Sequence, residues 1–217
     1  MNPRFNARQS LLCVVFLLAG VPAIGCDDEP RRDGPVVPAP EYDADALVAM
    51  RAERDAELRG PDSPVPASVR NSFTGLAYYP PNPELVFRAR LERFEHPDTI
   101  KVAATGGDVR MMTRFGLFRF DVAGTACSLT VYKSGPDAHL FLPFKDRTNG
   151  EETYEVGRYI DLEEQPGDEP YLLDFNLSYN PYCAYDASYT CPMVPLENIL
   201  TVAIPAGEKL PPFGVHH

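Results

Sequence analysis

The part of the chain after residue 60 contains no stretch that would form a helix long enough to cross a sheet, and this absence constrains the fold most. Short apolar runs are separated by turn residues, and 23 prolines are spread over the sequence. Parallel strands need long crossover connections, usually helical, whereas antiparallel strands can be joined by tight turns. We therefore predict a mainly β fold, an antiparallel β-sandwich or open barrel of short strands with one N-terminal helix.

Alternating apolar residues predict where the strands lie. The predicted strands cover residues 99–104, 109–113, 115–120, 127–132, 140–144, 159–162, 171–175 and 199–204. Gly106-Gly107-Asp108 is typical of a hairpin turn between the first two, and a second turn is expected near Gly124. In the fourth strand, Cys127 is expected to point into the core with Leu129 and Val131.

The predicted helix spans residues 43–59. It is rich in Ala, Leu, Met, Glu and Arg, has Asp43 as its N-cap and ends before Gly60-Pro61. Its apolar stripe is interrupted, because Leu47 and Leu58 share a face with Arg51 and Arg54. We expect this helix to lie on the domain with one narrow contact.

The N-terminus has the features of a bacterial lipoprotein signal peptide, predicted to cover residues 1–25. Arg4 and Arg8 precede an apolar stretch of fourteen residues at 11–24, shorter than the roughly twenty residues that span a bilayer. The stretch ends in Ala23-Ile24-Gly25-Cys26, which resembles a lipobox and predicts a lipid on Cys26. The alternatives are an ordinary signal peptide with a chance cysteine, or an uncleaved anchor.

Residues 26–42 are predicted to be a flexible linker. They begin with Asp27-Asp28-Glu29 and are rich in proline, a composition that buries no core. A lipid followed by a spacer places the single globular domain, residues 43–217, in the bacterial cell envelope, tethered to a membrane on its periplasmic or outer face. The signal peptide holds two of the 20 basic residues and none of the 31 acidic ones, so the mature chain has a formal charge of −13. This charge disfavours nucleic acid as a partner.

The last third of the sequence contains a dense series of motifs. In order they are LFLPFKDRT (140–148), GEETY (150–154), GRYIDL (157–162), LDFN (173–176), YNPYCAY (179–185), CP (191–192) and EN (197–198). This series resembles the bacterial and archaeal family called domain of unknown function 1684, over roughly residues 43–209. Ser178, where alanine is usual, and Met193 depart from the family pattern. The resemblance implies a shared fold, but no mechanism.

Twelve residues within these motifs form a candidate polar cluster, which serves either a ligand or the fold. They are Asp146, Glu152, Tyr154, Arg158, Tyr159, Asp174, Asn176, Tyr179, Asn180, Tyr185, Glu197 and Asn198. Tyrosines and polar groups together are typical of a pocket for a sugar, a peptide or another small molecule. The same residues can instead satisfy loop backbone and buried charges. The structural interpretation is favoured over the pocket.

A catalytic interpretation is the third alternative. If two of Asp146, Glu152, Asp174 and Glu197 converged, they could act as general acid and base in an envelope hydrolase. The sequence has no nucleophile elbow, Walker loop or zinc-protease motif. His96 and His139 are expected at the surface. We therefore predict no catalytic residue, no metal ligand and no cofactor. The expected function is that of a membrane-tethered structural protein, or of one that binds a small molecule or a protein partner.

Cys183 and Cys191 are predicted to form a disulfide. They lie eight residues apart in a loop rich in proline and tyrosine, and the envelope is an oxidising compartment. Such a bridge would stabilise the fold by about 2–3 kcal/mol through the unfolded state. Cys127 would then be the one buried free thiol of the mature domain.

Overall fold

The computed structural model describes residues 42–135 and 139–214. The predicted signal peptide, Cys26 and the linker up to residue 41 lie outside the described residues, as do His216 and His217. Among the described residues, no helix has the length and apolar character needed to span a bilayer.

The N-terminal helix is confirmed as α1 (Ala44–Glu57). Asp43 is its N-cap, and the Asp43 carboxylate accepts a hydrogen bond from the Ala46 N–H at 2.9 Å. A second, four-residue helix, α2 (Ala67–Arg70), follows. Short 3₁₀ turns occur at η1 (Pro83–Leu85), η2 (Phe175–Leu177), η3 (Tyr182–Ala184) and η4 (Leu196–Asn198).

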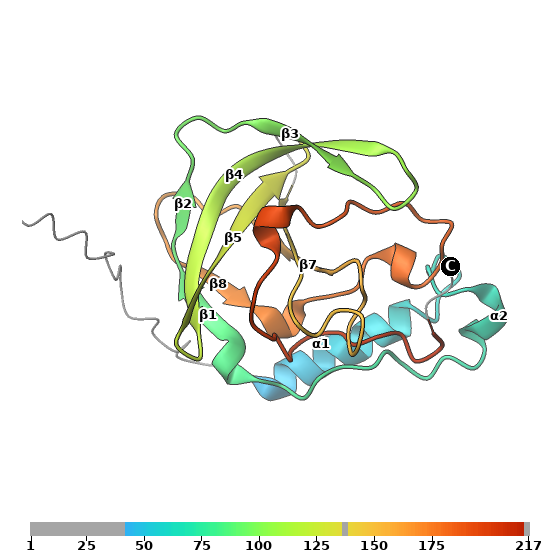
Figure 1. Cartoon of the computed structure of the whole chain (residues 1–217). Helices are drawn as coiled ribbons and strands as arrows, with labels where there is room; N and C mark the ends of the chain where they lie inside the picture. Colours follow the sequence, from blue (N-terminus) through green and yellow to red (C-terminus); the bar gives the residue numbers. More distant parts are fainter. Residues whose placement is uncertain (1–41, 136–138, 215–217) are drawn as a thin grey trace, which may run out of the picture. The chain divides into compact units, whose positions relative to one another are not determined.

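The rest of the described chain is built on two antiparallel sheets, which confirms the predicted mainly β class (Figure 1). The larger sheet has the order β2-β4-β5-β6-β7, with β3 also paired to β4, and β1 pairs with β8. The strands are β1 (Val86–Ala89), β2 (Leu91–Arg93), β3 (Thr99–Ala103), β4 (Val109–Val122), β5 (Thr125–Lys133), β6 (Leu140–Phe144), β7 (Arg158–Leu162) and β8 (Tyr171–Asp174). The sheets do not close into a barrel.

The β3–β4 hairpin forms as predicted, but β4 is one strand where two were expected. It runs past a register irregularity between Arg114 and Gly116. The turn into β5 places Ala123 and Gly124 at φ 49° and 84°, the backbone of a type I′ turn.

Residues 199–204 are not a strand, so this prediction was wrong. The Leu200 N–H donates to the Lys145 carbonyl at 2.8 Å and the Arg147 N–H donates to the Val202 carbonyl at 3.0 Å. No continuous ladder follows, because the chain after β6 turns away at residues 146–149. The apolar alternation reflects the burial of Leu200 and Ile204.

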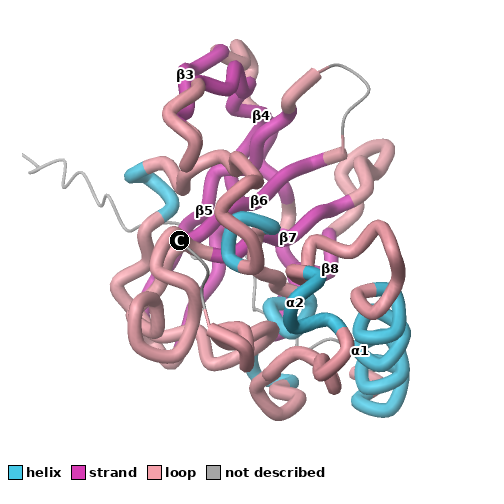
Figure 2. Tube along the Cα trace, turned by 90° about the vertical axis from the view of Figure 1, so that its right-hand side faces the viewer, coloured by secondary structure: helices cyan, strands magenta, loops and turns pink. Residues whose placement is uncertain are grey.

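The largest of the four apolar clusters in the described residues joins the two sheets. Its residues come from the inner positions of β1, β4, β5, β6, β7 and β8 and from the chain between residues 200 and 206. Cys127, Leu129 and Val131 all belong to it, as predicted. Outside this core, α1 lies at the edge of the domain (Figure 2), next to the chain that follows β8, where Arg51 donates to the Asn176 carbonyl.

Candidate functional site

Arg158 and Asp146 form a fully buried ion pair. Arg158, the first residue of β7, donates from Nη2 to Asp146 Oδ2 at 2.8 Å, and both side chains have no exposed surface. The guanidinium also donates to the carbonyls of Ile204 (2.9 Å) and Ala206. Asp146 Oδ1 accepts from the backbone and hydroxyl of Thr148. These contacts tie the C-terminal segment to the sheet.

The side chains of two buried asparagines, Asn198 and Asn176, form hydrogen bonds with backbone groups of other segments. Asn198 accepts from the Thr130 N–H at 2.8 Å and donates to the carbonyls of Thr130 and Pro143. Asn176 exchanges hydrogen bonds with the backbone of Asn82, accepting from its N–H and donating to its carbonyl, both at 2.8 Å. Both side chains therefore hold backbone segments together.

Two acidic cluster members, Glu197 and Glu152, form ion pairs that are partly exposed. Glu197 accepts from the Tyr132 hydroxyl and from Arg114, each at 2.8 Å. Burial alone would raise the pKa of Glu197, but hydrogen bonds from its backbone, Tyr132 and Arg114 lower it below the ordinary value. Glu152 forms an exposed ion pair with Lys209 at 3.2 Å.

The hydrolase hypothesis needs two of its four carboxylates to meet. Among the described residues, each of the four instead has its own partner. Asp146 binds Arg158, Glu152 binds Lys209, and Glu197 binds Arg114. Asp174 accepts from the backbone and side-chain amides of Asn176, and burial raises the pKa of its carboxyl. Within the described chain, no group of three or more acidic, His or Cys side chains is placed to hold a metal ion.

Cys183 and Cys191 lie together as free thiols. The Cys183 N–H donates to Cys191 Sγ at 3.3 Å, and the Tyr154 hydroxyl lies 3.8 Å from Cys183 Sγ. A hydrogen bond between the two thiols lowers the pKa of Cys183 and raises that of Cys191. Tyr159 donates from its hydroxyl to the carbonyl of Pro192 beside them. The predicted disulfide stays a prediction.

A groove of about 320 Å³ lies between α1 and the chain at residues 176–179. Its walls are the face of α1 that bears Arg51 and Arg54, together with Tyr78 and Glu208. This is the place where members of the candidate cluster, Asn176 and Tyr179, line a hollow.

Arg51 is held on one wall of this groove by neutral groups. Its Nη1 donates to the Tyr79 carbonyl at 2.8 Å and its Nη2 to the Asn176 carbonyl at 3.3 Å. The guanidinium lies 4.6 Å from the centre of the Tyr78 ring. Its Nε is buried and has no hydrogen-bond partner among the described residues. Burial lowers the pKa of Arg51.

Arg54 is paired with Glu208, of which only 1% is exposed. Arg54 Nε donates to Glu208 Oε1 at 2.6 Å, and Glu208 Oε2 accepts from the Asn180 N–H (2.8 Å) and the Tyr185 hydroxyl (2.6 Å). Arg54 also lies over the Tyr179 ring, 5.3 Å from its centre. Burial raises the pKa of Tyr179 and of Tyr185, so both hydroxyls stay protonated at neutral pH.

Gly207 allows Glu208 to reach this position. Its φ is +75°, and a Cβ atom there would lie 2.0 Å from Ser178 Oγ and 2.5 Å from the Ser178 carbonyl oxygen. The Glu208 N–H then donates to that carbonyl at 2.9 Å. A larger residue at 207 would push the chain segment that carries Glu208 away from the groove.

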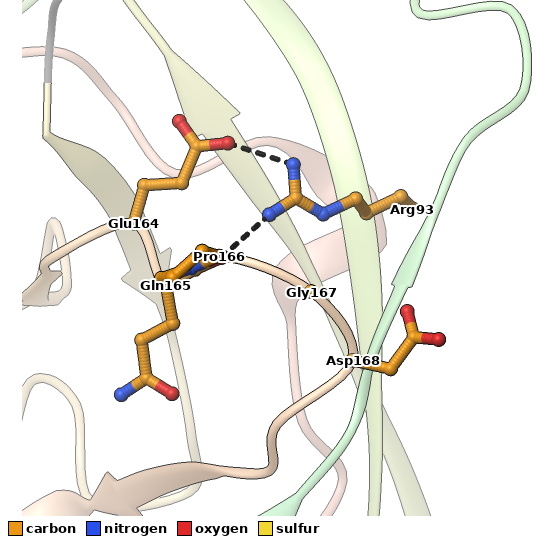
Figure 3. A pocket seen from close by; sticks show the side chains of 6 residues that line it. All are labelled: Arg93, Glu164, Gln165, Pro166, Gly167 and Asp168. Carbon is orange, nitrogen blue, oxygen red and sulfur yellow. Dashed lines mark hydrogen bonds and ion pairs between the residues drawn. The ribbon is translucent and has the colours of Figure 1, made fainter.

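A second hollow, of about 590 Å³, is bounded by Arg93 and the loop at residues 164–168 (Figure 3). Arg93 already donates to Glu164 at 2.7 Å and to the Gln165 carbonyl at 2.9 Å. Because these groups are exposed and satisfied by one another, this hollow is the weaker candidate.

The sequence profile of the family described as "Protein of unknown function (DUF1684)" matches residues 71–209. The chain belongs to this family. A solution NMR structure of an uncharacterized protein of Haloarcula marismortui is similar, with 33% identity and a TM-score of 0.62, covering 76% of this chain and 92% of that one. No curated protein matches the sequence.

The DUF1684 match begins after α1, later than the expected start at residue 43. Three groove residues, Arg51, Arg54 and Glu208, were not among the predicted site residues. The signal for the two arginines was their position on the apolar face of α1. Glu208 had no comparable signal, because its burial depends on partners 23 to 154 residues away.

Proposed function

We propose that the chain is a lipid-anchored protein of the bacterial cell envelope whose domain binds a small ligand without catalysis. The proposed organisation is a signal peptide at 1–25, a lipid on Cys26, a linker at 26–42 and a domain at 43–217. Its support is the basic start, the apolar stretch, the lipobox and the proline-rich spacer of the sequence.

The groove beside α1 carries the binding part of this proposal. It combines two guanidinium groups, two tyrosine rings and the apolar side chains of Met50 and Leu177, and its size is at the lower end for small-molecule sites. The other members of the candidate cluster line neither of the two hollows. Each of the four candidate carboxylates has a different partner, so no observation favours the alternative that the domain is a hydrolase.

We further propose that Cys183 and Cys191 become a disulfide in the exported chain. The two thiols are neighbours in space, and a lowered thiol pKa favours the thiolate that attacks an oxidised partner. The oxidant would be the disulfide of another protein. The S–S bond between Cys183 and Cys191 forms by thiol–disulfide exchange, and the two electrons and two protons of the thiols reduce the other protein's disulfide to two thiols.

The binding proposal can be tested on residues 42–217. The Haloarcula marismortui protein is folded in solution and is matched over 92% of its length, so we expect this fragment to fold by itself. We expect native mass spectrometry of the fragment, exported to the envelope and purified without refolding, to show a bound small molecule. Leu177→Trp should remove this mass because it fills the groove.

Leu172→Trp is the matched control. Leu172 is 47% exposed and Leu177 is 40% exposed, but only Leu177 lines the groove. The control should keep the bound mass and the thermal stability of the unaltered fragment. An empty unaltered fragment, or a mass that persists in Leu177→Trp, would overturn the binding proposal.

A further inference from the structure

One guanidinium of the groove, that of Arg51, makes no direct ion pair among the described residues, and Asp174 and Glu208 act on its charge only from a greater distance. Arg54 is neutralised by Glu208 at 2.6 Å. Arg51 forms no ion pair within the described chain; its two hydrogen bonds go to backbone carbonyls, and its Nε has no partner. A half-buried guanidinium without a directly bonded counter-ion is costly, and a ligand anion would form the direct ion pair that Asp174 and Glu208 do not form with Arg51.

The position of Arg51 is suited to a planar anion. The Tyr78 ring, 4.6 Å from the guanidinium carbon, and the two carbonyls hold the guanidinium in one orientation. An arginine fixed in this way loses little freedom when it binds a carboxylate through two parallel hydrogen bonds.

Beside this charge, the groove has an apolar edge. Met50 is 51% exposed and Leu177 is 40% exposed, and both line the groove together with the buried Leu47. Exposed apolar side chains next to a fixed charge match a ligand with one polar end and a hydrocarbon part.

The acids of the groove limit the charge of the ligand. Glu53 and Glu57 lie on its rim and Glu208 at its base, so the three acids exceed the two arginines by one. A dianion such as a phosphate monoester would be repelled by these carboxylates. A single carboxylate placed at Arg51 avoids most of that repulsion, because Glu208 is already paired and Glu53 and Glu57 are exposed to screening solvent.

We infer that the ligand of the groove is a small monocarboxylate with an apolar chain, bound through Arg51. This inference rests on the proposed binding function and names its ligand class. Arg51 orients the carboxylate, and Leu47, Met50 and Leu177 contact the chain.

The test uses octanoate as the probe, with octanol and octyl phosphate as the neutral and dianionic comparisons. Calorimetry on residues 42–217 should show binding of octanoate and at least tenfold weaker binding of the other two. Arg51→Gln should weaken octanoate binding about tenfold or more, because a hydrogen-bonded ion pair is lost. Arg59→Gln, outside the groove, should bind as the unaltered fragment does.

Arg51→Lys keeps the charge and should retain part of the affinity, which separates a lost anion contact from a loss of fold. Octanol binding as tightly as octanoate, or Arg51→Gln binding octanoate unchanged, would overturn the ligand class. If Leu177→Trp still removed a co-purifying mass in that case, the binding function would stand. If none of the probes binds and no mass co-purifies, both proposals fail.

Discussion

Arg158 is the largest of the fully buried side chains. Its pairing with Asp146 removes two charges from water, which is costly, and further hydrogen bonds to the chain at residues 204–208 offset part of that cost. Since the same segment carries Glu208, Arg158 positions the base of the groove from a distance.

Breaking this pair should be strongly destabilising. Asp146→Ala leaves the Arg158 charge buried without a counter-ion and should lower the free energy of unfolding by about 3–5 kcal/mol, measured by urea denaturation. Glu92→Ala removes the partner of Arg119 in an exposed ion pair and should cost less than about 1 kcal/mol. Similar small losses in the two variants would show that the buried pair contributes little.

At the residue scale, the sequence revealed which side chains need partners but not which partners they find. Asn176, Asn198 and Arg158 were expected to need partners, as polar groups in dense motifs. Whether they meet in a pocket depends on contacts between distant segments. Arg51 and Arg54 were visible as an interruption of an apolar stripe, and their contacts with the Asn176 carbonyl and with Glu208 became clear only from the placement of α1.

Among the elements, β5 and β6 depend on help from outside the sheet. Their register has a single residue pair, Tyr132 with Phe141. Asn198, from η4, bonds to the backbone of both strands at Thr130 and Pro143. The side chain of a distant turn thus takes the place of ladder hydrogen bonds, and Pro143 itself has no N–H to give.

Asn198→Ala should therefore destabilise the domain by about 2–4 kcal/mol, because it leaves buried backbone groups of both strands without partners. The measurement is thermal or urea unfolding of residues 42–217. Asn71→Ala is the control, since Asn71 is exposed at the end of α2 and should change stability by less than about 0.5 kcal/mol. Equal effects in the two variants would contradict the bridging role.

The elements themselves were largely predictable, because strands and turns are encoded locally. The helix, the β3–β4 hairpin and the core position of Cys127 follow from caps, glycines and alternation. Residues 199–204 misled the prediction, since their alternation records burial against a turn rather than pairing in a ladder. The β1–β8 pair joins segments more than 80 residues apart, such as Val86 and Asp174, and no local pattern specifies that.

On the scale of the whole molecule, the groove is built from the region that the family profile matches and from the helix before it. Residues 71–209 match the DUF1684 family and supply Tyr78, the 176–179 segment and Glu208. The other wall, α1, lies before the matched range. The similarity itself starts earlier than the profile match: the Haloarcula marismortui structure matches 76% of the 217 residues, about 165, and only 147 residues lie from residue 71 to the end.

The proposed export links the anchor to the cysteines. Full-length protein should fractionate with membranes, and after denaturation without reductant it should show one free thiol, Cys127. Cys26 would carry the lipid, and Cys183 and Cys191 would be bridged in the oxidising envelope. Residues 42–217 made in the cytoplasm should show three free thiols. Three free thiols in the exported chain would contradict the disulfide.

The lipid anchor has its own test. The Cys26→Ser variant should leave the membrane fraction or stay unprocessed, and a processed variant that is retained on membranes would contradict the anchor.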